Sequence, residues 1–353
     1  MIQGSMRSIQ DLGSIGVPAK AIGPVKIFGP EVDDEVMVPL ATFESPLWPS
    51  TQRGAKVTRL AGGIRAVIVD DRMTRSIILE ADNCVEAARM IEVFRCKKEQ
   101  LEQVVAASSR FCRLVDMNFQ IVGNLLFVRF EMETGDAAGH NMVTHAASNL
   151  ISWIMEHYPE LKYVSISGNY CTDKKATDVN GILGRGKYVV AELVIERDLC
   201  IQHLKTTPEK IAELNVKKNL IGTTLAGGMR TANAHFANIL LAFYLATGQD
   251  AANIVEGSQG IVHAEVRDGD LYFSVTVPNI IVGAVGNGKG LDFAARNLEE
   301  LGCMQSVGTG FNARRLAIII GATILCGELS LLAAQTNPGQ LMRAHLTLER
   351  SGV

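Results

Sequence analysis

An aspartate followed by two adjacent lysines, Asp173, Lys174 and Lys175, stands in a polar segment of this 353-residue chain. The apolar run 161–166 before it and the run 187–195 after it each predict a strand. A loop between two strands can direct an ammonium group into a cleft, where its charge stabilises an oxyanion. A single Asp-Lys-Lys tripeptide is more often a solvated turn, so its interpretation depends on the rest of the chain.

Further polar clusters interrupt the apolar background and carry side chains that exchange protons or bind anions. They contain Glu44 with the segment 50–53, Arg75, the segment 233–238 followed by 248–250, and His345. We expect the segment 50–53 to be a basic polar turn after a strand. Each cluster alone is a weak signal, because a single acid at a strand end or a histidine near a terminus is usually a solvated surface group.

The composition is that of a globular protein with a large core, since 47% of the residues are hydrophobic and 20% are charged. The length allows two domains. A net charge of −3 gives no electrostatic argument for a nucleic-acid partner. The seven cysteines are scattered and contain no CxxC pair, which indicates neither a disulfide framework nor a zinc site. We therefore expect no metal and a reducing, cytoplasmic environment.

The most apolar run, 316–326, is shorter than the about 18 residues that a membrane span needs. We expect it to be a buried core helix. The first residues lack the basic and apolar regions of a signal peptide. These features predict a soluble protein that does not bind a membrane.

Hydrophobic periodicity predicts an α+β protein. The expected helices are 84–105, 141–157, 233–246 and 311–335, and the expected strands are 36–42, 124–132, 161–166, 187–195 and 271–277. The block 76–167 has the composition of a compact α+β domain, and polar, glycine-rich segments flank it. We predict that residues 1–75 and 168–353 form one large domain and that 76–167 is a smaller domain inserted in it.

Taken together, these segments closely resemble the 3-hydroxy-3-methylglutaryl-CoA (HMG-CoA) reductase family over about residues 16–351. The matching segments occur in the same order and include 168–175, 218–222, 233–235, 248–253 and 327–331. The soluble catalytic domain of the branch shared by eukaryotes and archaea is the closer resemblance. It implies a large substrate-binding domain with an inserted, small, ferredoxin-like cofactor-binding domain. The stretch 136–141 is no G-x-G-x-x-G fingerprint, so a Rossmann domain is not expected.

The resemblance implies an activity, namely two successive hydride transfers from NADPH that reduce (S)-HMG-CoA to (R)-mevalonate and release coenzyme A, a step of isoprenoid biosynthesis. It also implies a homodimer or a higher homo-oligomer with sites at the subunit interface. The family's catalytic residues fall on Glu44, Lys174, Asp250 and His345. Lys174 would stabilise the oxyanion, Glu44 would supply a proton, Asp250 would tune both, and His345 would protonate the departing thiolate.

The remaining implied contacts are with the acyl group, with coenzyme A and with the dinucleotide. For the hydroxymethylglutaryl group they are Arg75, Ser167, Asp173, Lys175, Lys218 and Asn238, and for coenzyme A they are Ser50 and Arg53. For NADPH they are Ser109, Arg110, Phe111, Asp136, Ala138, Gly139, Asn141, Val285, Gly286 and Arg350. Without the resemblance, Asp136 or Asn141 would be interpreted as a plain helix cap.

The chain departs from the family pattern in three segments. Residues 19–23 lack the acidic and amide side chains of the family's first element, His140 replaces a smaller or thioether side chain, and Lys289 is added to the glycine-rich loop. A reductase of a different acyl-CoA therefore stays an alternative, as does a catalytically silent acyl-CoA-binding or regulatory protein. A silent binder would have no use for a Glu–Lys–Asp network that is costly to desolvate.

Overall fold

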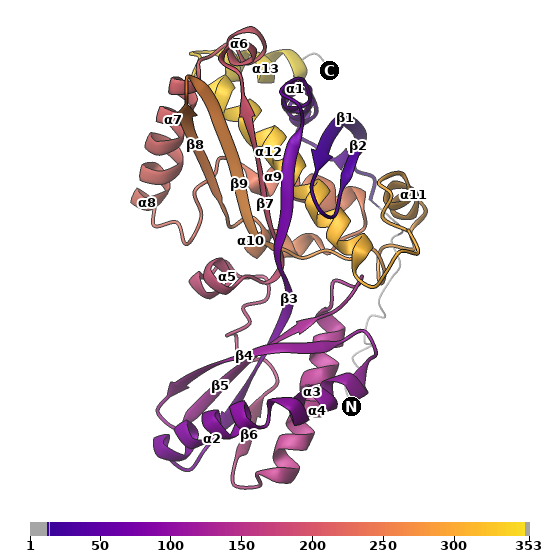
Figure 1. Cartoon of the computed structure of the whole chain (residues 1–353), viewed down its shortest axis with the longest axis vertical. Coiled ribbons are helices and arrows are strands. Elements are labelled where there is room, and N and C mark those ends of the chain that lie inside the picture. The colour runs from indigo at the N-terminus through magenta and orange to yellow at the C-terminus, as the bar shows by residue number, and fades with distance from the viewer. Residues whose placement is uncertain (1–12, 14, 350–353) are drawn as a thin grey trace, which may run out of the picture.

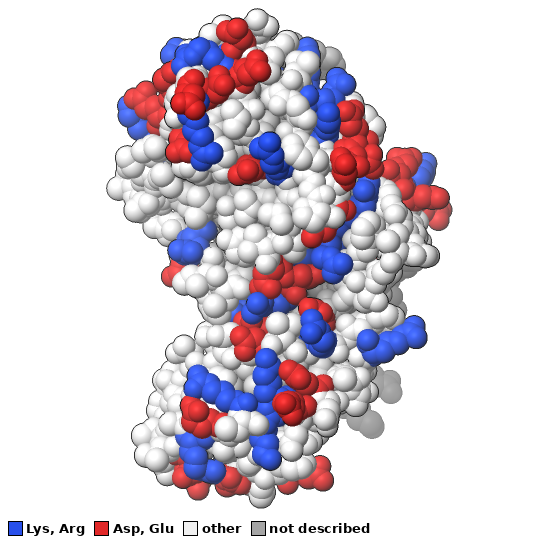
Figure 2. Space-filling view, in the orientation of Figure 1, with Lys and Arg blue, Asp and Glu red and all other residues white. Residues whose placement is uncertain are grey.

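The computed structural model describes residue 13 and residues 15–349 as an elongated molecule of two lobes (Figure 1). The large lobe contains the elements before residue 73 and after residue 177, and the small lobe contains the helices and strands between residues 73 and 165. Figure 2 shows acidic and basic side chains lying side by side where the lobes meet on this face.

The chain contains both strands and helices, as the prediction of an α+β protein requires. The strands are β1 Ala19–Phe28, β2 Asp33–Ala41, β3 Ile64–Glu80, β4 Arg113–Val122, β5 Leu125–Glu133, β6 Lys162–Ser165, β7 Gly186–Ile195, β8 Ile261–Arg267 and β9 Asp270–Ile280. The helices are α1 Leu47–Leu60, α2 Cys84–Cys96, α3 Lys98–Ser108, α4 His140–His157, α5 Asp178–Leu183, α6 Arg197–Leu199, α7 Pro208–Leu214, α8 Thr223–Leu225, α9 Phe236–Ala246, α10 Ile254–Gly257, α11 Asp292–Glu300, α12 Phe311–Gln335 and α13 Gln340–Glu349.

Strand β3 belongs to both lobes. Its residues 64–72 lie in the large-lobe sheet, whose order is β2-β1-β3-β7-β9-β8. Its residues 73–80 pair with β5 and β6 of the small lobe. The backbone therefore crosses between the lobes without leaving the extended conformation (Figure 1). The division expected between residues 75 and 76 lies inside this strand.

Each lobe has its own hydrophobic cluster, one around α9 and α12 and the other around α2, α3 and α4. Helix α12 has the bounds that the sequence predicted. By length and composition its 25 residues are enough to cross a membrane, but 94% of its most apolar window is buried inside the protein. The expectation of a buried core helix is confirmed, whereas the estimate of its apolar length was too short.

Two local expectations were wrong, and one strand of the small lobe was missed. Ser50 and Arg53 lie on helix α1, not in a turn. The single helix expected over 84–105 is two helices, because the backbone of Lys97 leaves the helical conformation (φ −98°, ψ 12°) between α2 and α3. Strand β4, which pairs with β5, was not anticipated.

Candidate active site

The lysine loop, defined here as residues 168–176, lies between β6 and α5 in a strained conformation. Asn169, Thr172 and Lys174 have positive φ angles of 54°, 45° and 55°. Non-glycine residues adopt this left-handed region only when the surrounding structure holds them there. Part of that support comes from β3, where the Ser76 hydroxyl oxygen accepts a hydrogen bond of 3.0 Å from the backbone N–H of Tyr170.

A buried ion pair supports the loop from the large lobe. Glu256 is fully buried, and its Oε1 lies 2.8 Å from a guanidinium nitrogen of Arg185, which is itself only 2% exposed. The same oxygen accepts the backbone N–H of Lys174 at 3.0 Å. Burial raises the pKa of Glu256, while the charge of Arg185 opposes that shift. Removing either partner would leave an uncompensated buried charge. Because Glu256 also accepts the Lys174 backbone N–H, the pair fixes the position of the Lys174 backbone.

Asp173 connects this ion pair to the small lobe. Its Oδ1 lies 3.1 Å from Arg185 and 3.6 Å from Nε2 of His140, the first residue of α4. Burial alone would raise the pKa of Asp173, but the contact with His140 and the charge of Arg185 together hold it well below its usual value. The carboxylate is therefore ionised at neutral pH.

Lys174 forms an ion pair with Asp250. The resemblance implied that these two residues act together. The Nζ–Oδ2 distance is 2.8 Å, and the two side chains are 41% and 47% exposed. The hydrogen bond to Asp250 raises the pKa of Lys174. Burial opposes ionisation of Asp250, but the bond from Lys174 lowers its pKa overall. The lysine thus stays an ammonium group that is accessible from solvent, as an oxyanion partner must be.

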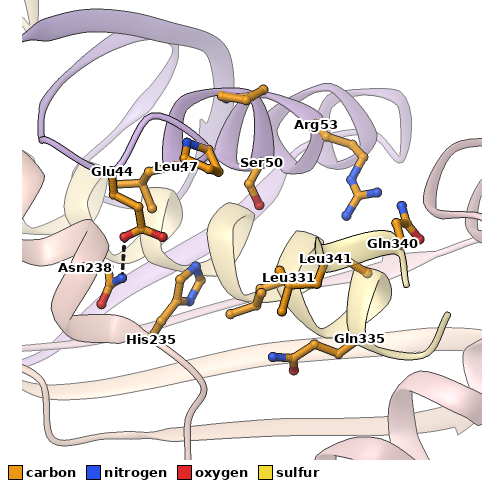
Figure 3. Close-up of a pocket in the computed structure, with 13 residues that line it drawn as sticks. Glu44, Leu47, Ser50, Arg53, His235, Asn238, Leu331, Gln335, Gln340 and Leu341 are labelled. Carbon is orange, nitrogen blue, oxygen red and sulfur yellow. Dashed lines mark hydrogen bonds between the residues drawn. The ribbon is translucent and has the colours of Figure 1, made fainter. Parts of the chain in front are cut away.

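A cavity of about 380 Å³ lies at the other end of α9, between α1, α9, α12 and α13 (Figure 3). Its lining comprises Glu44, Pro46, Leu47, Pro49, Ser50, Arg53, His235, Asn238, Leu331, Ala334, Gln335, Gln340 and Leu341. Glu44 Oε2 accepts a hydrogen bond of 2.6 Å from the amide of Asn238, drawn as a dashed line in Figure 3. The structure therefore brings predicted acyl-binding and coenzyme A-binding residues into one cavity.

Ser50 and Arg53 are anchored to α12 at the wall of this cavity. The hydroxyl groups of Ser50 and Ser330 are 3.1 Å apart, and Nε of Arg53 donates to the Ser330 hydroxyl at 3.0 Å. Burial lowers the pKa of Arg53. The guanidinium still carries a positive charge at neutral pH, because arginine loses its proton only far above it, and this charge beside the cavity suits an anionic ligand.

His235 was not among the predicted site residues, although it lines the cavity. Buried Glu328 on α12 accepts hydrogen bonds from the His235 backbone N–H and from its Nδ1, each at 2.6 Å. Burial lowers the pKa of Lys218, and Glu328 opposes that shift, so this lysine lies near the same carboxylate. The sequence signal was the Asn-Ala-His segment 233–235, but only the fold reveals the glutamate that orients the ring.

The segments 136–141 and 283–288, both predicted to contact the dinucleotide, lie against each other. The backbone N–H of Ala284 donates to the Asp136 carbonyl at 2.8 Å, and Ala137 bridges to Val285. A Cβ at Gly283 would stand 2.4 Å from a backbone nitrogen of this stretch, so only glycine permits the approach. The predicted cofactor residues Ala138, Gly139, Asn141, Val285 and Gly286 therefore share one surface.

The glycine-rich loop also approaches the predicted catalytic aspartate, Asp250. A Cβ at Gly248 would lie 2.3 Å from the carbonyl oxygen of Gly288, and Nζ of Lys289 donates to the Gly248 carbonyl at 3.0 Å. Burial lowers the pKa of Lys289, and Asp250 opposes that shift. The predicted dinucleotide surface thus adjoins the Lys174–Asp250 pair.

The carboxylate of Asp136 caps a helix, but not the helix that follows it. Its oxygens accept the backbone N–H groups of Gly310 at 3.1 Å and Ala313 at 2.9 Å, at the start of α12. Helix α4 instead begins after Gly139, whose φ is 96°. Asp136 therefore fastens the segment 136–141, predicted to bind the dinucleotide, to the core helix of the large lobe.

The remaining predicted residues are placed around these groups. Arg110 is exposed, with its guanidinium 4.6 Å from the ring of Phe111, and Ser109 Oγ accepts the Phe111 N–H at 3.2 Å. Arg75 donates to the Ile166 carbonyl at the base of the lysine loop. Ser167 and Lys175 are exposed. His345 lies in α13, but its side chain and the whole of Arg350 are outside the described part of the chain.

Within one chain the predicted catalytic groups form two sets at opposite ends of α9. The set of Glu44 and Asn238 is at the start of this helix, and the set of Asp250 and Lys174 is beyond its end. A helix of this length spans about 16 Å. Among residues 13 and 15–349, no hydrogen bond or ion pair joins Glu44 to either member of the second set.

Comparison with known proteins gives a consistent result. The sequence profile of the family described as hydroxymethylglutaryl-coenzyme A reductase matches residues 10–350. The 3-hydroxy-3-methylglutaryl-coenzyme A reductase of Aeropyrum pernix is 45% identical over 350 residues, which cover 98% of this chain and 83% of that protein. The protein of the same name from Pyrococcus abyssi is 45% identical, with 98% and 85% covered.

A solved structure shares the mixed α+β fold. It is the class II 3-hydroxy-3-methylglutaryl-CoA reductase from Streptococcus pneumoniae bound to NADPH in open conformations. The TM-score is 0.74 at 21% sequence identity, and the match covers 92% of this chain and 86% of the other.

Proposed function

This chain belongs to the hydroxymethylglutaryl-coenzyme A reductase family, and we propose that the thioester of HMG-CoA is reduced beside its Lys174–Asp250 pair. Members of this family are NADPH-dependent oxidoreductases that convert HMG-CoA to mevalonate, and this chain is such an enzyme. One observation supports this assignment. The ammonium group of Lys174 is accessible to solvent, is paired with Asp250, and is adjacent to the surface formed by 136–141 and 283–288.

The reaction has two reductions separated by the loss of a thiol. NADPH supplies the hydride in both. When the thioester carbon is reduced, its oxygen becomes an anion, and Lys174 stabilises that charge. The resulting thiohemiacetal releases coenzyme A and leaves an aldehyde, whose oxygen meets the same ammonium group in the second reduction. Because Asp250 keeps the lysine protonated, the charge is in place before each reduction begins.

Glu44 and His345 carry out the proton transfers. Glu44, held by Asn238, donates the proton that converts the second alkoxide to the alcohol. His345 protonates the departing coenzyme A thiolate, a task that suits a side chain titrating near neutral pH. Ser50 and Arg53 hold coenzyme A in the cavity, where fixed positive charge meets the anionic thiol carrier.

The small lobe is the cofactor-binding domain in this proposal. Residues 76–167 form it with a ferredoxin-like arrangement, and residues 1–75 and 168–353 form the substrate domain. This division is supported by the separate hydrophobic cluster of the small lobe and by the pairing of β4, β5, β3 and β6. Arg110, which is exposed, and Arg350 would select NADPH over NADH by meeting the 2′-phosphate.

The active form is a homodimer or a larger homo-oligomer with sites between subunits. The support for this proposal is the separation of the two catalytic sets by the length of α9 within one chain. An isologous two-fold contact would bring the lysine loop of one chain to the Glu44 cavity of the other, twice per dimer.

A different acyl-CoA stays the alternative substrate. The unusual segment 19–23 lies in β1, and Gln52 of α1 exchanges two hydrogen bonds of 2.8 Å with the backbone of Gly23. The altered element thus touches the helix that carries Ser50 and Arg53. A change there bears on coenzyme A binding more than on the chemistry beside Lys174.

The test is an assay of the purified protein with HMG-CoA and NADPH, which follows the absorbance of the reduced nicotinamide. Oxidation of two NADPH for each coenzyme A released establishes the reaction. A preparation of Lys174→Ala is the matched blank. Oxidation with another acyl-CoA but not with HMG-CoA would favour the alternative substrate, and no oxidation with any acyl-CoA would refute the assignment of the site.

A further inference from the structure

His140 is the side chain that most clearly distinguishes this site from the family pattern. It is the first residue of α4 and stands within the dinucleotide stretch 136–141. Its Nε2 is buried and has no hydrogen-bond partner in the described part of the chain, yet it lies 3.6 Å from Asp173 Oδ1. The ring as a whole is 25% exposed, so solvent protons reach it.

The charges that face His140 come from three parts of the fold. From the lysine loop, Asp173 is its direct neighbour and Lys174 follows. Asp250, beyond α9, also interacts electrostatically with the imidazole. Arg185, before β7, contacts the same Oδ1 of Asp173 and also pairs with buried Glu256 of α10.

Asp173 therefore joins the two lobes at the site. From the large lobe it is held by a guanidinium that is permanently charged. From the small lobe it is approached by an imidazole, the side chain whose charge changes between about pH 5 and 8. The carboxylate is a strong partner for a protonated imidazole and a weak one for the neutral ring at this distance. The strained loop depends on such outside contacts to keep its shape.

We propose that His140 is a pH-sensitive positioning residue, which in its protonated form draws the start of α4 onto Asp173 and so holds the lysine loop against the dinucleotide surface. As the pH rises and the imidazole loses its proton, the contact weakens and the loop is less firmly held. Its meaning for catalysis rests on the proposed function, because the loop carries Lys174 and is held against the segment 136–141 that is assigned to NADPH.

The contact between His140 and the loop can be measured without substrate or cofactor. In hydrogen–deuterium exchange on the free protein, peptides covering 168–176 are compared at pH 6 and pH 8 after correction for intrinsic exchange. We expect protection in the wild type to be about two- to fivefold greater at pH 6, the range for a partly exposed ion pair. His140→Gln should remove this difference. His145→Gln is the control, since His145 is exposed on the same helix, and it should behave as the wild type.

Steady-state kinetics then connect the contact to the reaction. In the wild type the KM for NADPH should rise about two- to fivefold between pH 6 and pH 8, and His140→Gln should abolish most of that rise while kcat changes little. Equal loop protection at both pH values in the wild type would overturn the inference, as would a pH dependence that survives in His140→Gln. A protein that shows the protection difference but does not reduce HMG-CoA would refute the proposed function and leave this contact standing.

Discussion

The two ends of helix α9 carry the two halves of the site, and they are built in opposite ways. Beyond the C-terminal end, Lys174 and Asp250 lie among fixed charges, with Arg185 and Glu256 buried beneath them. At the N-terminal end, Glu44 meets a single amide, that of Asn238, beside a cavity of about 380 Å³. One end fixes a charge in position, and the other end provides space.

The charged end and the open end of α9 suit the different tasks proposed for them. A group that stabilises an oxyanion acts best when its position and charge are set in advance, since it then reorganises little during the reaction. A group that handles coenzyme A must admit a large ligand and release it again. Strain and buried ion pairs are therefore concentrated at the lysine loop, whereas the cavity is lined by α1, α9, α12 and α13 with few buried charges.

Lys174→Ala removes the ammonium group beyond the C-terminal end of α9 and should have the largest effect on activity. Loss of one oxyanion partner typically lowers kcat by about 100- to 1000-fold. Circular dichroism and NADPH binding should be unchanged, because the backbone contact with Glu256 does not require the side chain. Lys175→Ala is the matched neighbour and should change KM for HMG-CoA more than kcat. A Lys174→Ala variant with more than about a tenth of the wild-type kcat would contradict the role.

His345→Gln tests the half that handles coenzyme A. It should slow reduction of HMG-CoA by about 100-fold, as loss of a general acid does, and reduction of added mevaldehyde much less. The reason is that only the thioester releases a thiolate that needs a proton. Equal loss with both substrates would mean that His345 has a structural role or positions the cofactor.

Arg110→Ala sharpens the comparison at the dinucleotide surface. A charge-assisted contact with the 2′-phosphate should be lost, which lowers the preference for NADPH over NADH about ten- to a hundredfold. The measurement is kcat/KM with both cofactors, and Arg113→Ala serves as the control because that side chain is paired with Glu133. An unchanged ratio would remove Arg110 from the cofactor site.

Asp173→Asn should have the smallest effect, and the effect is on stability. The pKa of Asp173 is depressed, so its carboxylate contributes stability above the unfolded pKa of about 3.9, and this is lost as the pH falls through the folded value. The variant should melt about 2 °C below the wild type from pH 5 to 8. That gap should begin to narrow as the pH falls below about 3.9. A gap that is constant down to pH 3 would contradict the linkage.

The sequence predicted some of the elements that position the proposed site and missed others. The strands on both sides of the lysine loop and helix α12 follow from apolar periodicity and were predicted. Helix α1 was missed because Pro49, Ser50 and Gly54 suggest a turn, and tertiary packing against α12 overrides that preference. Strand β3 was missed because Asp70, Asp71 and Arg72 interrupt its apolar pattern where it passes between the lobes.

The charges beneath the lysine loop could not be predicted for a different reason. Arg185 and Glu256 are far apart in the sequence, and a charged residue is normally assigned to the surface. Their burial is a property of the assembled fold. His235 could have been proposed from its place in the segment 233–235, but its orientation depends on Glu328, which comes from a different helix.

The central claim is that the two ends of α9 serve one reaction only when two chains meet. Glu44→Ala and Lys174→Ala proteins, each inactive alone, are mixed under conditions in which native mass spectrometry shows subunit exchange. If each site draws these residues from different chains, half of the dimers are mixed and each has one intact site, so about a quarter of the wild-type activity should return. Activity that stays at the level of the separate variants, despite demonstrated exchange, would contradict the claim.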